Sequence, residues 1–383
     1  MLSRLQQLRR DERGMSFVFV GLSLMAFVAA TTLAIDVGMF MAGRSQAQNA
    51  ADAGALGGAT ALAFDSFDNR APGGPAVQSA INTALQNNVV SGAVSVTTAD
   101  VTFPVGPAGL ANRVKVDVFR TGPRSNPVPT LMGPLFGVPT VNISATATAE
   151  ASPANAMRCV KPFTIPDRWI ENKNPPWTTN SSFDRYDNQG NVIPNADVYH
   201  PVGEPGYVGY DATRDKGMLL TIRAGTGNNV EPTMYFSWSM PSSIGGDDYR
   251  GNIANCNTTL VHFDQDMVQE PGNMVGPTNQ GIDDLIAKDP SAFWDMATNS
   301  VHSSMNPSPR VFPIPLYDPD YYQSGVTNGR NATLKVANWI GFFVENRAGN
   351  NIFGRITPIL GVIDDNAGPA PTGTFPVAIR LVQ

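Results

Sequence analysis

The feature that most constrains this chain is the uncharged apolar stretch from Met15 to Ile35. An α-helix rises about 1.5 Å per residue, so a helix over this stretch is about 31 Å long, close to the ~30 Å hydrocarbon core of a bilayer. The apolar region of a signal peptide is shorter, about 7–15 residues. The stretch therefore predicts a transmembrane helix.

Basic residues are distributed unequally around this helix. Asp11 and Glu12 offset part of the positive charge before it, and Arg44 is the only basic residue soon after it. The positive-inside rule then places the N-terminus in the cytoplasm and everything after Asp36 on the other side of the membrane. The preceding basic residues are Arg4, Arg9, Arg10 and Arg13.

Small residues recur every fourth position in two series. Such series form ridges that let helices approach closely in a membrane, which predicts a helix-packing face. The alternative is composition, because more than half of positions 44–63 are Ala or Gly. The first series is Ala26, Ala30, Ala34 and Gly38, continuing to Ala42, and the second is Ala47, Ala51, Ala55, Ala59 and Ala63.

Two motifs connect these series, IDVG at 35–38 and QNAADA at 48–53. With the basic segment and the apolar helix before them, they resemble the N-terminus of TadE/TadG-like proteins of the Tad (Flp, tight adherence) pilus system, over residues 13–63. The resemblance implies a bilayer-anchored component of bacterial pilus assembly that contacts other Tad pilus or pilin-like subunits through its N-terminal helix. The family motif residues are Asp36, Gly38, Gln48, Asn49 and Asp52.

Pilin-type members of this system are cleaved after a Gly and carry Glu at the fifth mature position. The candidate processing site here is the bond between Gly14 and Met15, and the fifth residue would then be Phe19. A lone carboxylate in an apolar filament core needs a partner, and the helix contains no Glu at all. The chain therefore resembles the anchored TadG-type branch. The alternative is a minor pilin-like tip subunit or adhesin, cleaved after Gly14.

The sequence predicts an α+β organisation in four parts. Residues 1–14 are a cytoplasmic basic stub, and residues 15–63 are the transmembrane helix with its Ala-rich extracytoplasmic extension. Residues 64–153 form a small α+β sandwich, and residues 154–383 form a mostly β distal domain, because Gly and Pro are frequent (36 and 31) and charged residues make up only 15%. The C-terminal domains are expected in the periplasm or outside the cell, anchored by a single pass through the bacterial inner membrane, with pilus association as a further expectation.

Within residues 64–153, a helix at 76–88 is predicted to bury Val77, Ile81, Ala84 and Leu85. Alternation of apolar and polar residues predicts strands at 113–119 and 141–151. A short helical turn is expected at 129–137. The text from Val128 to Pro153 is also typical of the family.

The distal domain contains six stretches that read as strands and one that reads as a helix. Ile282, Leu285 and Ile286 share one face of that helix, at 278–289. Cys159 and Cys256 predict a disulfide, since two thiols in an exported chain favour pairing; two buried free thiols are the alternative. The expected strands lie at 217–225, 233–240, 309–317, 334–346, 351–363 and 374–383.

No catalytic, cofactor or metal site can be assigned from the sequence. The net charge of −6 argues against nucleic acid as a partner. The Asp-x-Ser-x-Ser loop of a von Willebrand A domain does not occur, nor does a calcium loop with suitable oxygens. The three histidines, His200, His262 and His302, are far apart in sequence, which disfavours zinc.

Two further hypotheses concern the distal domain. His262 lies close in sequence to Asp264 and Asp266, which would suit a membrane-anchored hydrolase, although no nucleophile can be nominated. The five tryptophans could instead form a face that binds a glycan or another surface, but core positions are the more common role for Trp. They are Trp169, Trp177, Trp238, Trp294 and Trp339.

Overall fold

The computed structural model describes residues 13–65, 68–106, 109–225, 229–241, 243, 245–327 and 333–382. The chain divides into two compact units. The anchor unit comprises residues 1–150 and 380–383, and the distal unit comprises residues 151–379. Of the predicted cytoplasmic stub, residues 1–12 lie outside the described residues.

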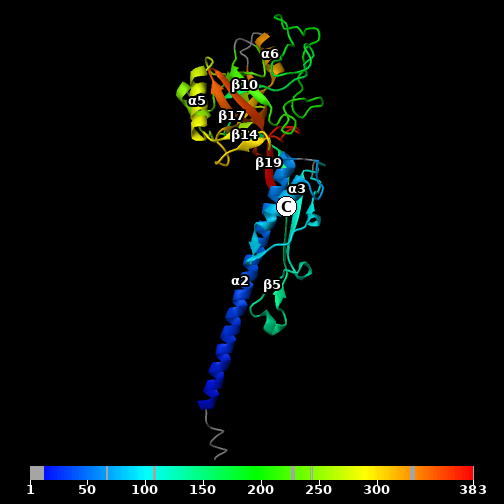
Figure 1. Ribbon diagram of the computed structural model, residues 1–383, viewed down its shortest axis with the longest axis vertical. Coiled ribbons are helices and arrows are strands. Elements are labelled where there is room, and N and C mark those ends of the chain that lie inside the picture. Colours follow the sequence, from blue (N-terminus) through cyan, green and yellow to red (C-terminus); the bar gives the residue numbers. More distant parts are fainter. Residues whose placement is uncertain are drawn as a thin grey trace, which may run out of the picture. The chain divides into compact units, whose positions relative to one another are not determined.

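The anchor unit is organised around one long helix, α2 (Arg13–Phe64), of 52 residues. The predicted transmembrane stretch and the Ala-rich extension are therefore one continuous element, which appears in blue in Figure 1. Its N-terminal part is long and apolar enough to cross a membrane, and the most apolar 18-residue window has no buried residue.

A four-stranded sheet packs beside the C-terminal half of α2, with strand order β19-β7-β4-β3. Its centre is the antiparallel pair β4 (Arg113–Arg120) and β7 (Ile143–Pro153), in register from Arg113 opposite Glu150 to Arg120 opposite Ile143. Residues of β4 alternate between half-buried and buried, as the sequence pattern predicts for a sheet with one covered face. The outer strands are β3 (Val101–Thr102) and β19 (Val377–Val382).

Helix α3 (Pro75–Leu85) packs against α2. The predicted buried face of α3 is wrong at Leu85, which is exposed, whereas Ala76 and Ala80 are fully buried. The reason is close helix packing: Ala84 and the Ala80 carbonyl lie only 3.0 Å from where a Cβ on Gly54 would stand. The small residues of α3, rather than its large ones, therefore face α2.

Short elements complete the anchor unit. Two of them, β5 (Val128–Pro129) and β6 (Thr140–Val141), form an antiparallel ribbon that ends in the 3₁₀ turn η3 (Gly133–Phe136), where the sequence predicts a short helical turn. The remaining short elements are β1 (Asn88–Val89), β2 (Gly92–Ala93), η1 (Thr98–Asp100) and η2 (Gly122–Arg124).

In the distal unit, six strands close into a barrel of mixed direction. They run in the order β17-β16-β9-β11-β10-β18, and β18 pairs again with β17. The β9–β16 and β10–β11 pairs are parallel and the other four are antiparallel. The strands are β9 (Phe163–Pro166), β10 (Leu219–Ala224), β11 (Met234–Ser237), β16 (Val311–Tyr317), β17 (Leu334–Ala348) and β18 (Asn351–Thr357).

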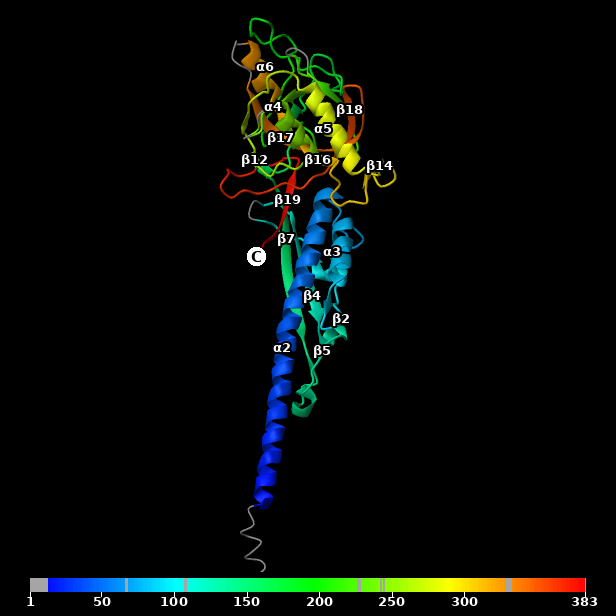
Figure 2. The same cartoon turned by 90° about the vertical axis from the view of Figure 1, so that its left-hand side faces the viewer.

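The barrel encloses the main core of the distal unit, in which Phe163, Trp339 and Phe342 are fully buried. Helix α5 (Val275–Lys288), in yellow in Figure 2, contacts β17 and buries Ile282 and Leu285, while Ile286 is half-buried. Helices α4 (Gly245–Ala254) and α6 (Pro319–Thr327) are not predicted from the sequence. The remaining strands are β8 (Ala156–Met157), β12 (Val261–His262), β13 (Asp266–Met267), β14 (Phe293–Asp295) and β15 (Ser300–His302).

Cys159 and Cys256 are joined by a disulfide with a sequence separation of 97. The bond connects the segment before β9 with the segment after α4. The predicted fold class is confirmed: a long apolar N-terminal helix is followed by an α+β layer and a mostly β distal part.

Candidate functional site

Helix α2 changes its surroundings sharply along its length. From Met15 to Ile35 the large apolar side chains are exposed, whereas buried positions recur every third or fourth residue from Gly43 onward. Met41 is the last exposed large apolar residue of the helix, and Arg44 begins its polar surface. One helix thus presents a lipid-compatible half and a half that is packed within its own unit.

The predicted packing residues Ala26, Ala30, Ala34 and Gly38 belong to the exposed half. A Cβ added at Gly38 would meet nothing within 4 Å. This first series, here called the open stripe, is therefore accessible to another helix as far as the described residues show. Its role in membrane helix packing stays a prediction.

The second series has a different environment. Ala47, Ala51, Ala55 and Ala59 are fully buried, and the neighbouring Gly58 would place a Cβ 2.8 Å from a methyl group of Val114 and 3.0 Å from Ala80. These small residues let α3 and β4 approach the axis of α2 closely. The described contacts of the second series are thus made inside the anchor unit, rather than with a separate membrane helix.

Asp36 stands between the two halves of α2 and is only 3% exposed. Its carboxylate accepts hydrogen bonds from the backbone N–H of Leu131 at 2.7 Å and of Met132 at 2.8 Å. Leu131 and Met132 directly precede the η3 turn, and Met132, at the N-cap position of that turn, makes no capping hydrogen bond with its side chain. The motif carboxylate thereby binds a loop that is 95 positions away in sequence.

The QNAADA motif combines packing with a polar rim. Ala50 and Ala51 are fully buried, and Gln48 donates from its amide to Asp52 at 2.8 Å and to the Thr146 carbonyl at 3.2 Å. Asn49 is exposed. Gln48 and Asp52 line an open hollow of about 600 Å³ in the anchor unit, together with residues 146–148, Leu381 and Val382.

The predicted proximity of His262 to Asp264 and Asp266 is not observed as a catalytic arrangement. His262 Nε2 lies 2.9 Å from Asp364 Oδ2 instead, whereas Asp264 forms an ion pair with Lys335 at 2.6 Å. Asp264 lies beyond the end of the short strand β12, and its φ of 65° is outside the extended range of a strand. Among the described residues, no group of three or more His, Cys, Asp or Glu side chains could hold a metal ion.

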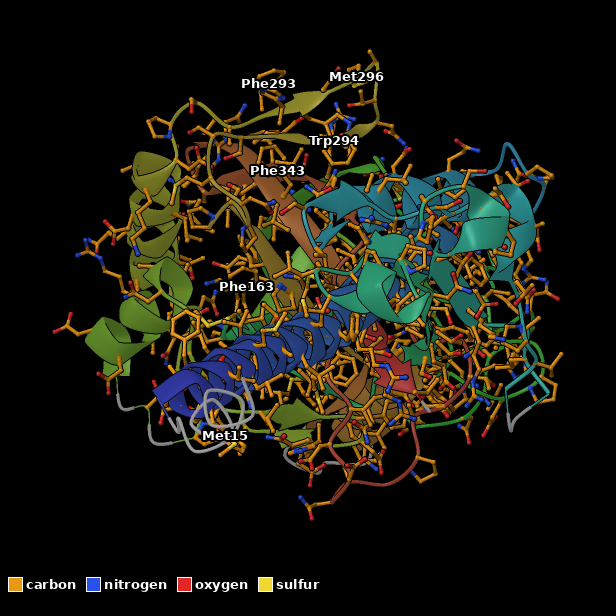
Figure 3. All side chains as sticks on the ribbon, turned by 90° about the horizontal axis from the view of Figure 1, so that it is seen from below. Met15, Phe163, Phe293, Trp294, Met296 and Phe343 are labelled. Atoms are coloured by element: carbon orange, nitrogen blue, oxygen red, sulfur yellow. A yellow bond between two sulfur atoms is a disulfide. The ribbon has the colours of Figure 1, made fainter. Side chains whose placement is uncertain are left out.

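The tryptophans do not form a surface face. Trp169, Trp238 and Trp339 are buried in the main core, and Trp177 is partly buried against it. Trp294 is buried in a separate small cluster with Ala292 and Phe343. Trp294 packs on Phe343 with ring centroids 6.3 Å apart, while its neighbours Phe293 and Met296 on the β14–β15 hairpin are exposed (Figure 3). A glycan-binding face built from Trp is therefore wrong for the described side chains.

The distal unit also buries a carboxylate that sequence reasoning does not identify. Asp167 is fully buried and accepts hydrogen bonds from the hydroxyl groups of Tyr199 at 3.1 Å and Tyr207 at 3.0 Å. Burial raises the pKa of Asp167 from its ordinary value of 3.8 to about 6, because the charged form loses its hydration. No sequence motif marks this residue.

Comparison with known proteins gives a match in the N-terminal segment. Residues 14–61 match the family model Tad, described as "Putative Flp pilus-assembly TadE/G-like". No curated protein and no solved structure matches the chain. The matched range covers nearly all of α2, including the open stripe, Asp36 and the QNAADA motif. Residues 14–61 are therefore similar to the TadE/G-like family of Flp pilus assembly.

Proposed function

We propose that this protein is a membrane-anchored structural or assembly component of a Tad-type (type IVc) pilus, without enzymatic activity. The observation that carries the proposal is the match of residues 14–61 to the TadE/G-like family over a helix whose first half is apolar and exposed. The proposed topology is a single pass through the bacterial inner membrane, with the N-terminus in the cytoplasm and the chain after Asp36 on the far side.

The mechanism would be mechanical. A continuous helix of 52 residues is about 78 Å long, so α2 extends well beyond a hydrocarbon core of ~30 Å. Its second half is fixed in the anchor unit by close packing at Gly54 and Gly58. Other pilus or pilin-like helices would dock on the open stripe, and the anchor unit would hold their position relative to the membrane.

The alternative role is a minor pilin-like tip subunit or adhesin. It differs from the permanent anchor in one covalent detail, the bond between Gly14 and Met15. N-terminal sequencing of the protein from membrane and pilus fractions of its native host distinguishes the two roles. The anchored role predicts that residues 1–14 are retained in the membrane fraction, and a mature N-terminus at Met15 in the pilus fraction would contradict it.

A membrane-anchored hydrolase or a glycan-binding protein is the remaining alternative. The His262–Asp364 pair is half-exposed and no nucleophile accompanies it among the described contacts. We expect His262→Ala to leave pilus assembly unchanged in a piliation assay of the native host. Loss of piliation by a variant that remains folded and at normal abundance would reopen a chemical role.

A further inference from the structure

We propose that the loop between β5 and β6, residues 130–139, is a second membrane contact that inserts apolar side chains into the lipid interface beside the anchor helix. It is called the interfacial loop below. This inference rests on membrane anchoring by α2, which is part of the proposed function. It adds a lipid-binding surface that is far from α2 in sequence.

The first support is the absence of charge. Between Arg124 and Glu150 the sequence contains no charged residue, and between Arg13 and Arg44 the only charged residue is Asp36. Asp36 is also the residue that binds the loop, through the N–H groups of Leu131 and Met132. The uncharged segment that contains the loop is therefore hydrogen-bonded to the helix at Asp36, the only charged residue of either segment.

The second support is position along the helix. The predicted hydrocarbon span ends at Ile35, one residue before Asp36, and polar surface begins at Arg44. The intervening residues rise about 12 Å, which is enough to cross the headgroup region of one leaflet, about 5–8 Å thick. In both Figure 1 and Figure 2, the turn below β5 is the part of the anchor unit nearest the Arg13 end of α2, apart from α2 itself.

The third support is the exposure of apolar side chains on the loop. Leu131 is 61% exposed and Val138 is 49% exposed, although the backbone N–H groups of both residues are hydrogen-bonded. Transfer of exposed apolar side chains from water to an apolar phase lowers the free energy. At the level of Asp36, the proposed topology provides such a phase at the boundary of the hydrocarbon core.

The fourth support is the pairing of backbone groups. The N–H groups of Thr130, Gly137 and Val138 donate to carbonyls of the loop itself, those of Leu131 and Met132 donate to Asp36, and Pro134 and Pro139 have none. Backbone that approaches hydrocarbon must have its donors paired, because lipid offers no replacement for water. The Thr130 hydroxyl also donates to the Val138 carbonyl at 2.7 Å, which further closes the loop.

The experiment uses the complete chain reconstituted into zwitterionic phosphatidylcholine vesicles. Since Cys159 and Cys256 are bonded to each other, a single introduced cysteine can carry an environment-sensitive fluorophore. The test variant is Leu131→Cys. The matched control is Val105→Cys, which is 62% exposed in a loop of the same unit that is distant in sequence from Asp36. Phe27→Cys reports whether α2 itself is in the bilayer.

We expect the label at position 131 to show a blue-shifted emission, several-fold stronger quenching by lipid-attached nitroxides than the label at 105, and weaker quenching by aqueous iodide. Because the loop is uncharged, this result should persist in high salt and should not require anionic lipid. Adding Asp36→Asn should reduce the lipid quenching at position 131, since the charged acceptor is lost.

Three outcomes would overturn the inference. One is iodide quenching at 131 equal to that at 105, and another is shielding from both quenchers, which would indicate a protein partner. The third is a strict requirement for anionic lipid. If the label at Phe27 is also outside the bilayer, membrane anchoring fails as well. If the label at Phe27 is buried in lipid and the label at 131 is not, only the present inference fails.

Discussion

At the scale of single residues, the buried carboxylates are the positions where this protein departs most from a simple apolar core. Asp36 has two amide donors, and Asp167 has two tyrosine hydroxyls and backbone donors. Sequence identifies Asp36 as part of a motif but not its role, because its partners are 95 and 96 positions away. Contacts of that range leave no local pattern.

Asp167 gives a prediction about pH. Its pKa is about 6 in the folded protein and 3.8 ordinarily, so the folded state binds the proton more tightly. The free energy of unfolding should therefore decrease as pH rises from about 4 to about 6 and level off above, by about 3 kcal/mol for two pKa units. We expect Asp167→Asn to flatten this decrease, measured by urea unfolding between pH 4 and 7.

Asp318 provides the control for that experiment. Burial also raises its pKa to about 6, so a smaller pH dependence should remain in Asp167→Asn. A variant whose unfolding free energy depends on pH as steeply as that of the wild type would show that Asp167 does not carry the effect.

At the scale of elements, the exposed half and the packed half of α2 should respond differently to added volume. Gly58→Ala forces a Cβ to within 2.8 Å of Val114, and overpacking of this kind costs about 1–3 kcal/mol. Gly38→Ala meets nothing within 4 Å and replaces a poor helix former, so it should not destabilise the fold. Thermal unfolding of both variants in detergent tests this, and equal losses would contradict the packing described.

The open stripe makes a prediction about assembly. Ala30→Leu adds bulk to the exposed ridge and not to the packed half of α2, so folding should persist while recovery of other pilus subunits decreases. Val28→Leu is the control, because it enlarges an exposed side chain on the opposite face of α2. Co-purification from native membranes measures the effect. Equal recovery with both variants would argue against docking on this stripe.

Sequence patterns predicted some elements well and others poorly, for physical reasons. Strands β4 and β7 alternate regularly, and α5 has apolar residues at helical spacing, so all three are predicted. Helix α4, GGDDYRGNIA, contains three glycines and few apolar residues, and α6 is short; neither has a periodic signal. The face of α3 is mispredicted because large side chains usually mark the core, whereas here close packing selects alanines.

At the scale of the whole molecule, strand content was predictable and barrel closure was not. The ring depends on parallel pairs such as Leu316 with Ile165, whose strands are separated by long stretches of other structure. The Cys159–Cys256 pairing was accessible because only two cysteines occur. The structure divides the chain into two compact units. The finer division predicted at residues 63 and 153 stays a prediction.

The disulfide should contribute to stability through the unfolded chain. With a sequence separation of 97, the loop-entropy relation gives about 4–5 kcal/mol as an upper value. We expect the double variant Cys159→Ser, Cys256→Ser to lower the unfolding free energy of the distal unit toward that extent, measured by urea unfolding against the oxidised wild type. Free thiols at these positions in exported protein, found by non-reducing peptide mapping, would contradict the bond.

The discontinuous anchor unit has a consequence for biosynthesis. Residues 380–383 belong to this unit, and β19 lies at the edge of its sheet next to β7. Because synthesis proceeds from the N-terminus, α2 and β7 emerge long before β19 does. Until then β7 is an unpaired sheet edge, which is a ready template for strands of other chains. The part of the protein made first is thus completed last, and a ribosome stalled before residue 380 leaves that edge open.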